Sequence, residues 1–365
     1  MADIFDYLHW RGDLTIKQVP LGEVDSLIFC RLAYMNFDGI VPGGFDEKPV
    51  FIQDAAQQCI ADAEKKDSER DISKEDIKLL TEIALCPRYA KMALTGYVCE
   101  TDESQEKQFA AVTILTDKRS SYTAFRGTDN TLIGWKEDFN MTFQISVPSQ
   151  RAAAAYLKTA MESIGGSFYV GGHSKGGNLA VYAAAFSEDA CFDRIVTVFN
   201  HDGPGFDTSV LETEGYRRAI EKTKTFVPQS SFFGLMLYHE ETITVVHSNH
   251  IGIFQHDLYS WEIERDRFVY EQNVSENSTE FNEALKEWIA KLEPGTRKLL
   301  IDGLYKVVVT TQAKTFSDLF KGKNSLVLLR ALKDIDEPTR ELLVHAVSLL
   351  TQRQKSQSPP ALIEE

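Results

Sequence analysis

Cysteine is scarce in this chain of 365 residues, and its five cysteines are scattered: Cys30, Cys59, Cys86, Cys99 and Cys191. They form neither the paired spacing of a metal site nor the dense pattern of a disulfide scaffold, so we expect reduced thiols and no metal. Long apolar runs are lacking too, which excludes a predicted transmembrane segment. The first residues lack a basic start followed by an apolar run, so we expect no cleaved secretion signal and a cytoplasmic protein.

Basic residues are outnumbered, with 39 Lys and Arg against 54 Asp and Glu, a net charge of -15. No run of Lys and Arg interrupts this balance. A surface of this sign repels phosphate backbones and anionic lipid headgroups, so nucleic acid is a poor default partner. The hydrophobic fraction of 43% and the charged fraction of 25% are ordinary for a globular protein and argue against disorder.

The pattern of apolar residues divides the chain into three parts. Residues 1–100 are predicted to be a mostly helical segment packed on the core. Residues 101–275 alternate short strands with helices, which predicts an α/β core with a mostly parallel sheet covered by helices. Residues 276–365 are helical by their spacing and form a predicted appendage that ends in a tail.

The most informative segment is a Gly-x-Ser-x-Gly turn. A short apolar strand at 168–171 leads directly into Gly172-His173-Ser174-Lys175-Gly176, and an alanine-rich helix follows. Such a turn leaves no room for side chains at its glycines, and it holds the serine at a strained backbone angle with the hydroxyl exposed. We therefore predict Ser174 as a nucleophile. The competing interpretations are a glycine-rich turn that only packs closely and a phosphate-binding loop. The phosphate-binding loop requires a longer glycine pattern ending in Lys-Ser or Lys-Thr, which is absent.

Two further motifs lie upstream: Phe125-Arg126-Gly127-Thr128 and Gly134-Trp135-Lys136-Glu137-Asp138-Phe139. Together with the serine turn, they resemble the class 3, triacylglycerol-lipase-like branch of the α/β hydrolases. The chain is more similar still to an uncharacterised bacterial group related to those lipases, which shares Asp202-Gly203-Pro204-Gly205-Phe206 and Gln255-His256-Asp257. The resemblance covers residues 1–262 and implies an α/β-hydrolase fold.

The resemblance also implies roles for residues near the serine. Thr128 and the backbone amide of Lys175 would form the oxyanion hole, and Arg126 and Asp138 would form a structural ion pair. Residues 131–148 occupy the position of a lipase lid. This chain departs from the lipases at Lys175, where they have leucine, so we expect a charge or a long polar arm at the pocket floor.

The base of the predicted triad is His256, which lies downstream of the last predicted strand. Its place in the chain order serine, acid, histidine and its Gln-His-Asp context favour it. Three other histidines lie in predicted loops and remain alternatives: His239, His247 and His250.

The acid of the predicted triad departs from the lipase pattern. Lipases have an aspartate after the strand that corresponds to residues 224–227, but here Pro228-Gln229-Ser230-Ser231 follows, without a carboxylate. Asp202, one strand earlier, can still reach the imidazole and fix its tautomer. The alternatives are that Asp202 only organises the Gly-Pro turn, and that Glu240 or Glu241 serves instead.

The resulting hypothesis is hydrolysis of a carboxylic ester through an acyl-enzyme, without a metal or organic cofactor. The expected partner is a lipid or another small-molecule ester, and the same machinery serves amides and thioesters. The alternative is a catalytically inactive lipase-fold binding or scaffold protein, because Ser230 and Ser231 stand where lipases have the acid.

Overall fold

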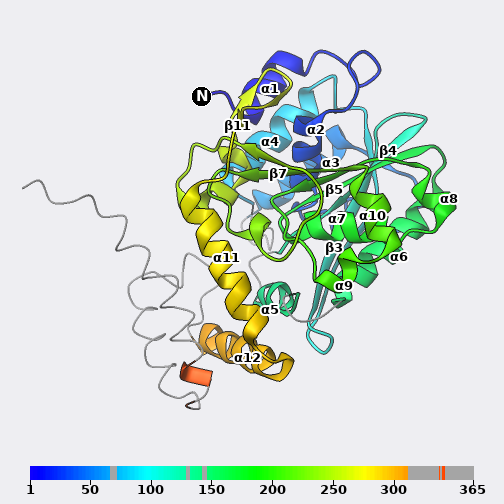
Figure 1. Cartoon of the computed structure of the whole chain (residues 1–365). Coiled ribbons are helices and arrows are strands. Elements are labelled where there is room, and N and C mark those ends of the chain that lie inside the picture. The colour runs from blue at the N-terminus through cyan, green and yellow to red at the C-terminus, as the bar shows by residue number, and fades with distance from the viewer. Residues whose placement is uncertain (66–71, 129–131, 142–145, 311–336, 338, 342–365) are drawn as a thin grey trace, which may run out of the picture.

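The computed structural model describes residues 1–65, 72–128, 132–141, 146–310, 337 and 339–341 (Figure 1). Its centre is a mixed sheet of nine strands in the order β1-β2-β3-β4-β5-β6-β7-β8-β11. The strands from β4 to β8 pair in parallel, and β1, β2, β3 and β11 add antiparallel pairs at the two edges. The predicted α/β fold with a largely parallel central sheet is confirmed.

The bounds of the sheet strands are β1 Val50–Phe51, β2 Ala93–Asp102, β3 Lys107–Leu115, β4 Ser120–Phe125, β5 Ser167–His173, β6 Ile195–His201, β7 Thr223–Pro228, β8 Ile243–Val246 and β11 Tyr270–Glu271. A separate two-stranded ribbon consists of β9 Ile263–Glu264 and β10 Arg267–Phe268. Parallel strands all end at the same edge of a sheet, so the segments that follow β4, β5, β6 and β7 are brought together there.

Helices cover both faces of this sheet because its buried strands alternate their side chains between two cores. In β4, Tyr122 and Ala124 belong to one core and Phe125 to the other. The first core is shared with α1 Ile4–Arg11, α2 Glu23–Leu32, α3 Ile52–Ala63 and α4 Lys74–Leu85. The second is shared with α6 Pro148–Ser163, α7 Lys175–Ala185, α8 Asp189–Phe192, α9 Thr208–Leu211 and α10 Glu214–Ile220.

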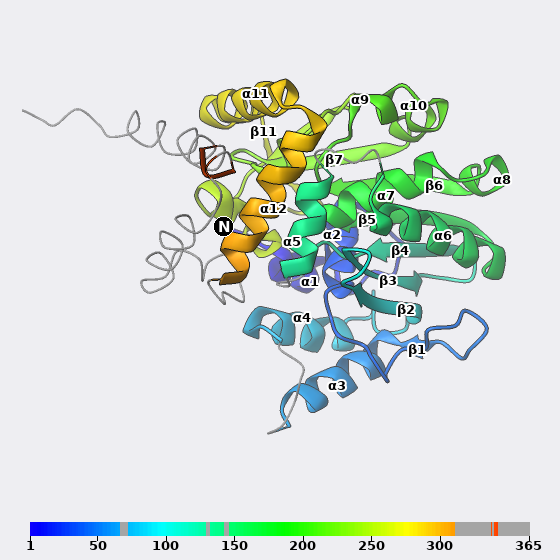
Figure 2. The same cartoon turned by 90° about the horizontal axis from the view of Figure 1, so that it is seen from below.

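Two further helices, α11 Glu276–Lys291 and α12 Pro294–Thr310, follow the last strand. Figure 2 shows α12 lying alongside α5 Leu132–Asn140, and Lys136 of α5 lies 3.3 Å from Asp302 of α12. The amide of Asn282 on α11 donates to the backbone carbonyl of Ser231 at 3.5 Å. The division into three parts stays a prediction, and its boundary at residue 100 falls inside β2.

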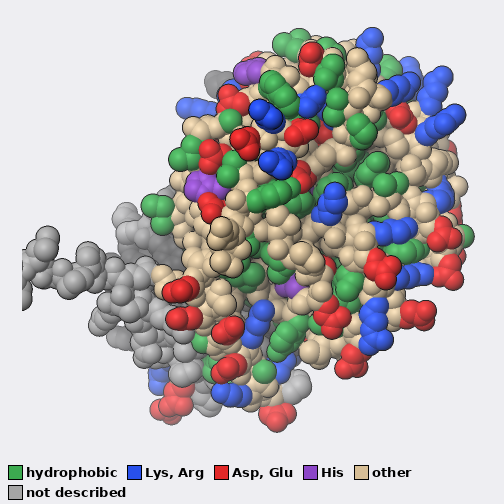
Figure 3. All heavy atoms as spheres, turned by 45° about the horizontal axis from the view of Figure 1, so that its top comes forward, with side chains coloured by type: hydrophobic (Ala, Val, Ile, Leu, Met, Phe, Trp, Pro, Cys, Tyr) green, Lys and Arg blue, Asp and Glu red, His purple; other side chains and the backbone are tan. Residues whose placement is uncertain are grey.

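The surface shows no dominant sign of charge on the face drawn in Figure 3, where acidic and basic side chains are interspersed. Among the described helices, none combines the length and the apolar composition that a bilayer span requires.

Candidate active site

The Gly-x-Ser-x-Gly turn connects the end of β5 to the start of α7. Ser174 sits between them with φ 58° and ψ -135°, a region that non-glycine residues occupy only under strain. A Cβ atom at Gly172 would lie 2.1 Å from the carbonyl of Gly176, and one at Gly176 would lie 2.2 Å from the carbonyl oxygen of Phe125. Both positions therefore require glycine, as predicted, and the half-buried Ser174 stands at the tip of the turn.

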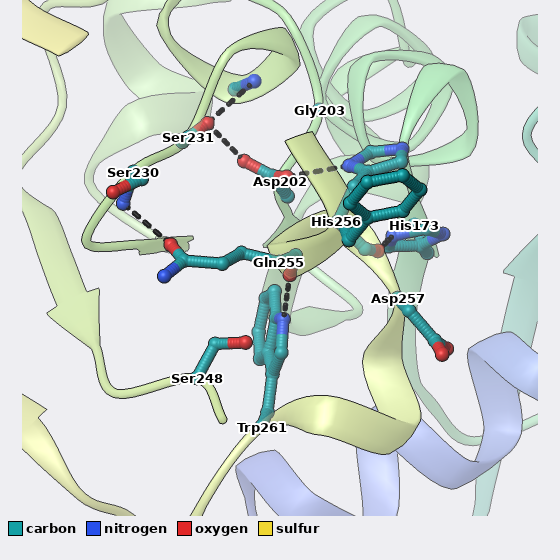
Figure 4. A network of polar contacts seen from close by, with 12 residues as sticks. His173, Asp202, Gly203, Ser230, Ser231, Ser248, Gln255, His256, Asp257 and Trp261 are labelled. Carbon is teal, nitrogen blue, oxygen red and sulfur yellow. Dashed lines mark hydrogen bonds and ion pairs between the residues drawn. The ribbon is translucent and has the colours of Figure 1, made fainter. Parts of the chain in front are cut away.

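Asp202 and His256 meet at the edge of the sheet where the parallel strands end. Asp202 directly follows β6 and is fully buried, and its Oδ2 lies 2.5 Å from Nδ1 of His256 (Figure 4). The hydroxyl of Ser231 donates to the other oxygen, Oδ1, at 2.5 Å. A carboxylate oxygen accepts, so Nδ1 of His256 carries the proton and Nε2 is left free to accept one.

The imidazole of His256 lies between two other rings. The rings of His173 and Phe233 each have their centroid 4.4 Å from that of His256. His173 directly precedes Ser174, so the imidazole lies at the serine turn, and 21% of its side chain is exposed. Among the described residues, His256 forms hydrogen bonds with Asp202 through Nδ1 and with His173 through its backbone carbonyl, and none with the Ser174 hydroxyl.

His256 is the last residue of a short 3-10 helix, Gly252–His256. Gln255 anchors this helix through both its side chain and its backbone carbonyl. The side-chain oxygen of Gln255 accepts from the backbone N–H of Ser230 at 2.7 Å, and its carbonyl accepts from the Trp261 indole at 2.9 Å (Figure 4). The Gln-His-Asp motif therefore places an anchoring residue next to the histidine.

The alternative bases and acids are engaged with other groups. His239 pairs with Glu241 at 2.9 Å, His247 pairs with Glu271 at 2.8 Å, and His250 contacts the carbonyl of Phe254. Burial alone would raise the pKa of Glu241, but the hydrogen bond and charge of His239 bring it down to about 2. Of the four candidate histidines, His256 is the one that the structure joins to Asp202.

Lys175 does not carry a charged arm to the pocket floor, and that expectation was wrong. Its side chain is 1% exposed, and its ammonium donates to Glu137 Oε2 at 2.9 Å and to the carbonyl of Gln108 at 2.9 Å. Glu137 belongs to α5, so the residue after the serine ties α5 to β3. Sequence reasoning missed Glu137, although the opposite charges in the two motifs were a signal that they pair.

Thr128 and Asp138 lie next to each other beside this ion pair. The Thr128 hydroxyl donates to Asp138 Oδ2, and the Lys175 ammonium lies 3.9 Å from Asp138 Oδ1. Asp138 thus contacts Thr128 and Lys175, and the expected ion pair between Arg126 and Asp138 stays a prediction. Burial raises the pKa of the Asp138 carboxyl to about 6, against the opposing effect of Lys175. In the predicted lid region, α5 occupies 132–140, while 129–131 and 142–145 lie outside the described residues.

Comparisons with known proteins found a matching family and a small number of similar solved structures. The model of a family described as Mbeg1-like matches residues 83–306, more than half of the chain. Three solved chains match, among them one titled "Crystal structure of M37 lipase". It is 14% identical and has a TM-score of 0.34, with 58% of this chain and 69% of that chain covered. At that TM-score the similarity supports no argument about function. No curated protein matches the sequence.

Proposed function

This chain belongs to the Mbeg1-like family, and from the geometry of its site we propose that it is a serine hydrolase that cleaves carboxylic esters. Ser174 is the nucleophile, His256 the general base and Asp202 the acid of the triad. The observation that carries the proposal is the 2.5 Å contact between Nδ1 of His256 and the buried carboxylate of Asp202, beside a serine held at φ 58°.

The reaction follows from the arrangement of these groups. Ser174 Oγ attacks the ester carbonyl while His256 Nε2 takes its proton, and the Asp202 carboxylate stabilises the imidazolium that forms. The alcohol leaves with that proton, and an acyl group stays on Ser174. A water molecule, deprotonated by His256, then attacks the acyl-enzyme and releases the carboxylic acid.

Two donors are proposed for the negative charge on the tetrahedral intermediate. Lys175 is the first residue of α7, where a backbone N–H has no acceptor within the helix, so its amide can donate to the oxyanion. Thr128 is the second proposed donor, and its hydroxyl must turn from Asp138 toward the oxyanion to contribute. The Ser174 hydroxyl must likewise form its hydrogen bond to His256, and such catalytic hydrogen bonds often tighten only when substrate binds.

The missing lipase acid after β7 does not leave the site without a carboxylate. Ser231, which lies in that segment, donates its hydroxyl to Asp202 and thus supports the acid supplied by β6. This contact supports an active enzyme over the inactive binding or scaffold alternative. For a substrate, we propose an uncharged ester, either a lipid or a small molecule, since the net charge of -15 disfavours anionic compounds.

The test is hydrolysis of p-nitrophenyl esters of increasing acyl length by the wild type, Ser174→Ala and Ser187→Ala. Ser187 lies just after α7 and only donates to the carbonyl of Ala183, so its loss is a matched control. We expect hydrolysis by the wild type and the control and none above background by Ser174→Ala. Equal rates for all three proteins would reject Ser174 as the nucleophile.

A further inference from the structure

His173, the second residue of the serine turn, contacts His256 in two ways, through its Nε2 atom and by packing of the two rings. Its Nε2 lies 2.9 Å from the backbone carbonyl oxygen of His256, and the two ring centroids are 4.4 Å apart. A carbonyl oxygen only accepts hydrogen bonds, so Nε2 of His173 must carry a proton. This assigns the tautomer of His173 from geometry.

Tyr34 completes the arrangement from a distant part of the chain. It follows α2, and its hydroxyl lies 3.1 Å from Nδ1 of His173. Burial first, and then the neighbouring His256, keep the pKa of His173 well below its usual range, so the ring is neutral and Nδ1 accepts. Burial raises the pKa of Tyr34, which therefore keeps its proton and donates it. The hydrogen bonds thus run in one direction, from Tyr34 through His173 to His256.

Tyr34 is itself held in place. The Arg31 guanidinium lies 5.0 Å from the centre of its ring, and Arg31 forms two hydrogen bonds of 2.6 Å with Asp76. The hydroxyl of Tyr259, three residues after His256, donates to the same Asp76 at 2.6 Å. A Cβ atom at Gly127 would lie 2.3 Å from the Tyr34 hydroxyl, so this hydroxyl also fills the space beside the Thr128 loop.

The segment that carries His256 needs such support because its first half is open to solvent. Ile251 is 85% exposed and Phe254 is 65% exposed, so apolar packing holds little of this segment. Gln255 anchors it on the side of Ser230, and the backbone carbonyl of His256 is its contact on the side of the serine turn.

We propose that Tyr34 and His173 are positioning residues that hold the catalytic base. The hydrogen bond from His173 to the His256 carbonyl is the contact that fixes the position of His256. This inference rests on the proposed role of His256. The pair sets the distance between the imidazole and Ser174, while Asp202 sets the tautomer of that imidazole. Loss of the pair should slow the chemical step without weakening substrate binding, because neither residue needs to touch the ester.

The experiment compares Tyr34→Phe, His173→Asn and His173→Gln with the wild type. Glutamine is long enough to place an amide donor near the position of Nε2, whereas asparagine is too short. Tyr270→Phe is the matched control, because Tyr270 is 47% exposed and its hydroxyl donates to Glu23 at the start of α2. For each protein, the labelling rate with a fluorophosphonate probe and kcat and KM for a p-nitrophenyl ester are measured.

We expect kcat and the labelling rate to fall for Tyr34→Phe and His173→Asn, by up to about 100-fold for a displacement near 1 Å. KM should change little, and His173→Gln should recover part of the loss. Wild-type rates in folded Tyr34→Phe and His173→Asn would overturn the proposal, as would a loss confined to KM or equal losses in the glutamine and asparagine variants.

A second readout does not depend on activity. In the Ser174→Ala variant, the Nδ1 proton that His256 donates to Asp202 should give a downfield proton NMR signal. This signal should shift or broaden in the double variant that also carries Tyr34→Phe. An unchanged signal would overturn the positioning role. If the wild type is never labelled, the proposed function fails, while this signal still tests the contact between His173 and His256.

Discussion

Replacement of Lys175 by methionine should destabilise the protein strongly, because the lysine neutralises a buried carboxylate. Lys175 and Glu137 are 1% and 0% exposed, and their charged atoms lie 2.9 Å apart. The Lys175 ammonium makes two more hydrogen bonds, to the carbonyl and the side-chain oxygen of Gln108. Methionine fills a similar volume but supplies none of these donors.

The magnitude follows from what remains after the substitution. Glu137 keeps two backbone donors, Gln108 N–H at 3.0 Å and Ser149 N–H at 2.9 Å, but its charge has lost its counter-ion. Removal of one partner of a buried ion pair costs about 3–5 kcal/mol of folding free energy. Adding Glu137→Gln removes the stranded charge, so the double variant should be more stable than the sum of the single losses by about 1–3 kcal/mol.

The assay is urea unfolding followed by circular dichroism for the wild type, the two single variants and the double variant. Lys158→Met is the matched control, since Lys158 pairs with Glu188 on the exposed surface and should leave the urea midpoint nearly unchanged. A free energy of unfolding for Lys175→Met within about 1 kcal/mol of the wild type would refute the reasoning, because a stranded buried charge costs more than that.

Three further predictions follow from the site and the fold. Asp202→Asn should keep the fold and lower kcat for ester hydrolysis on the order of 10⁴-fold, because the imidazolium loses its counter-charge and the imidazole its tautomer; a loss under tenfold would count against Asp202 as the acid. The pKa of Asp138 is raised to about 6, so the folded state binds a proton between about pH 4 and 6 and stability falls as the pH rises through that window. Asp138→Asn should remove this fall, so the urea midpoint of the variant minus that of the wild type should be larger at pH 7 than at pH 5. The same difference at both pH values would contradict the assignment. A chain that ends at residue 275 should still fold and hydrolyse esters, because α11 and α12 add no strand to the sheet, although its urea midpoint should be lower than that of the full chain. Loss of the circular dichroism spectrum of the fold would show that the two helices are part of the core.

The serine turn could be predicted from the sequence because its requirements are local. Gly172 and Gly176 are needed by backbone atoms within the turn or on the adjoining strand, and the strand and helix that flank Ser174 have their own short-range patterns. Asp202 could be placed from the order of the strands, since parallel neighbours end at one edge, and His256 from its place in the chain order and its Gln-His-Asp context. Their catalytic role stays a proposal.

Other contacts could not be predicted because they join segments that no periodicity relates. Lys175 and Glu137 are 38 positions apart, and Tyr34 and His173 are 139 positions apart. The resemblance to lipases drew attention to Lys175 but suggested a charge or a long polar arm at the pocket floor, since it gave no buried partner for the charge. It also gave no indication that the hydroxyl of Thr128 contacts Asp138.

The central claim is that Ser174 is an activated nucleophile, and covalent modification tests it most directly. The folded wild type is incubated with a fluorophosphonate probe, with and without detergent, and the adduct is located by intact-mass and peptide mass spectrometry. The account predicts a single adduct on Ser174, absent from Ser174→Ala and formed slowly by Asp202→Asn. A folded wild type that stays unmodified in both conditions, or an adduct on another residue, would contradict it.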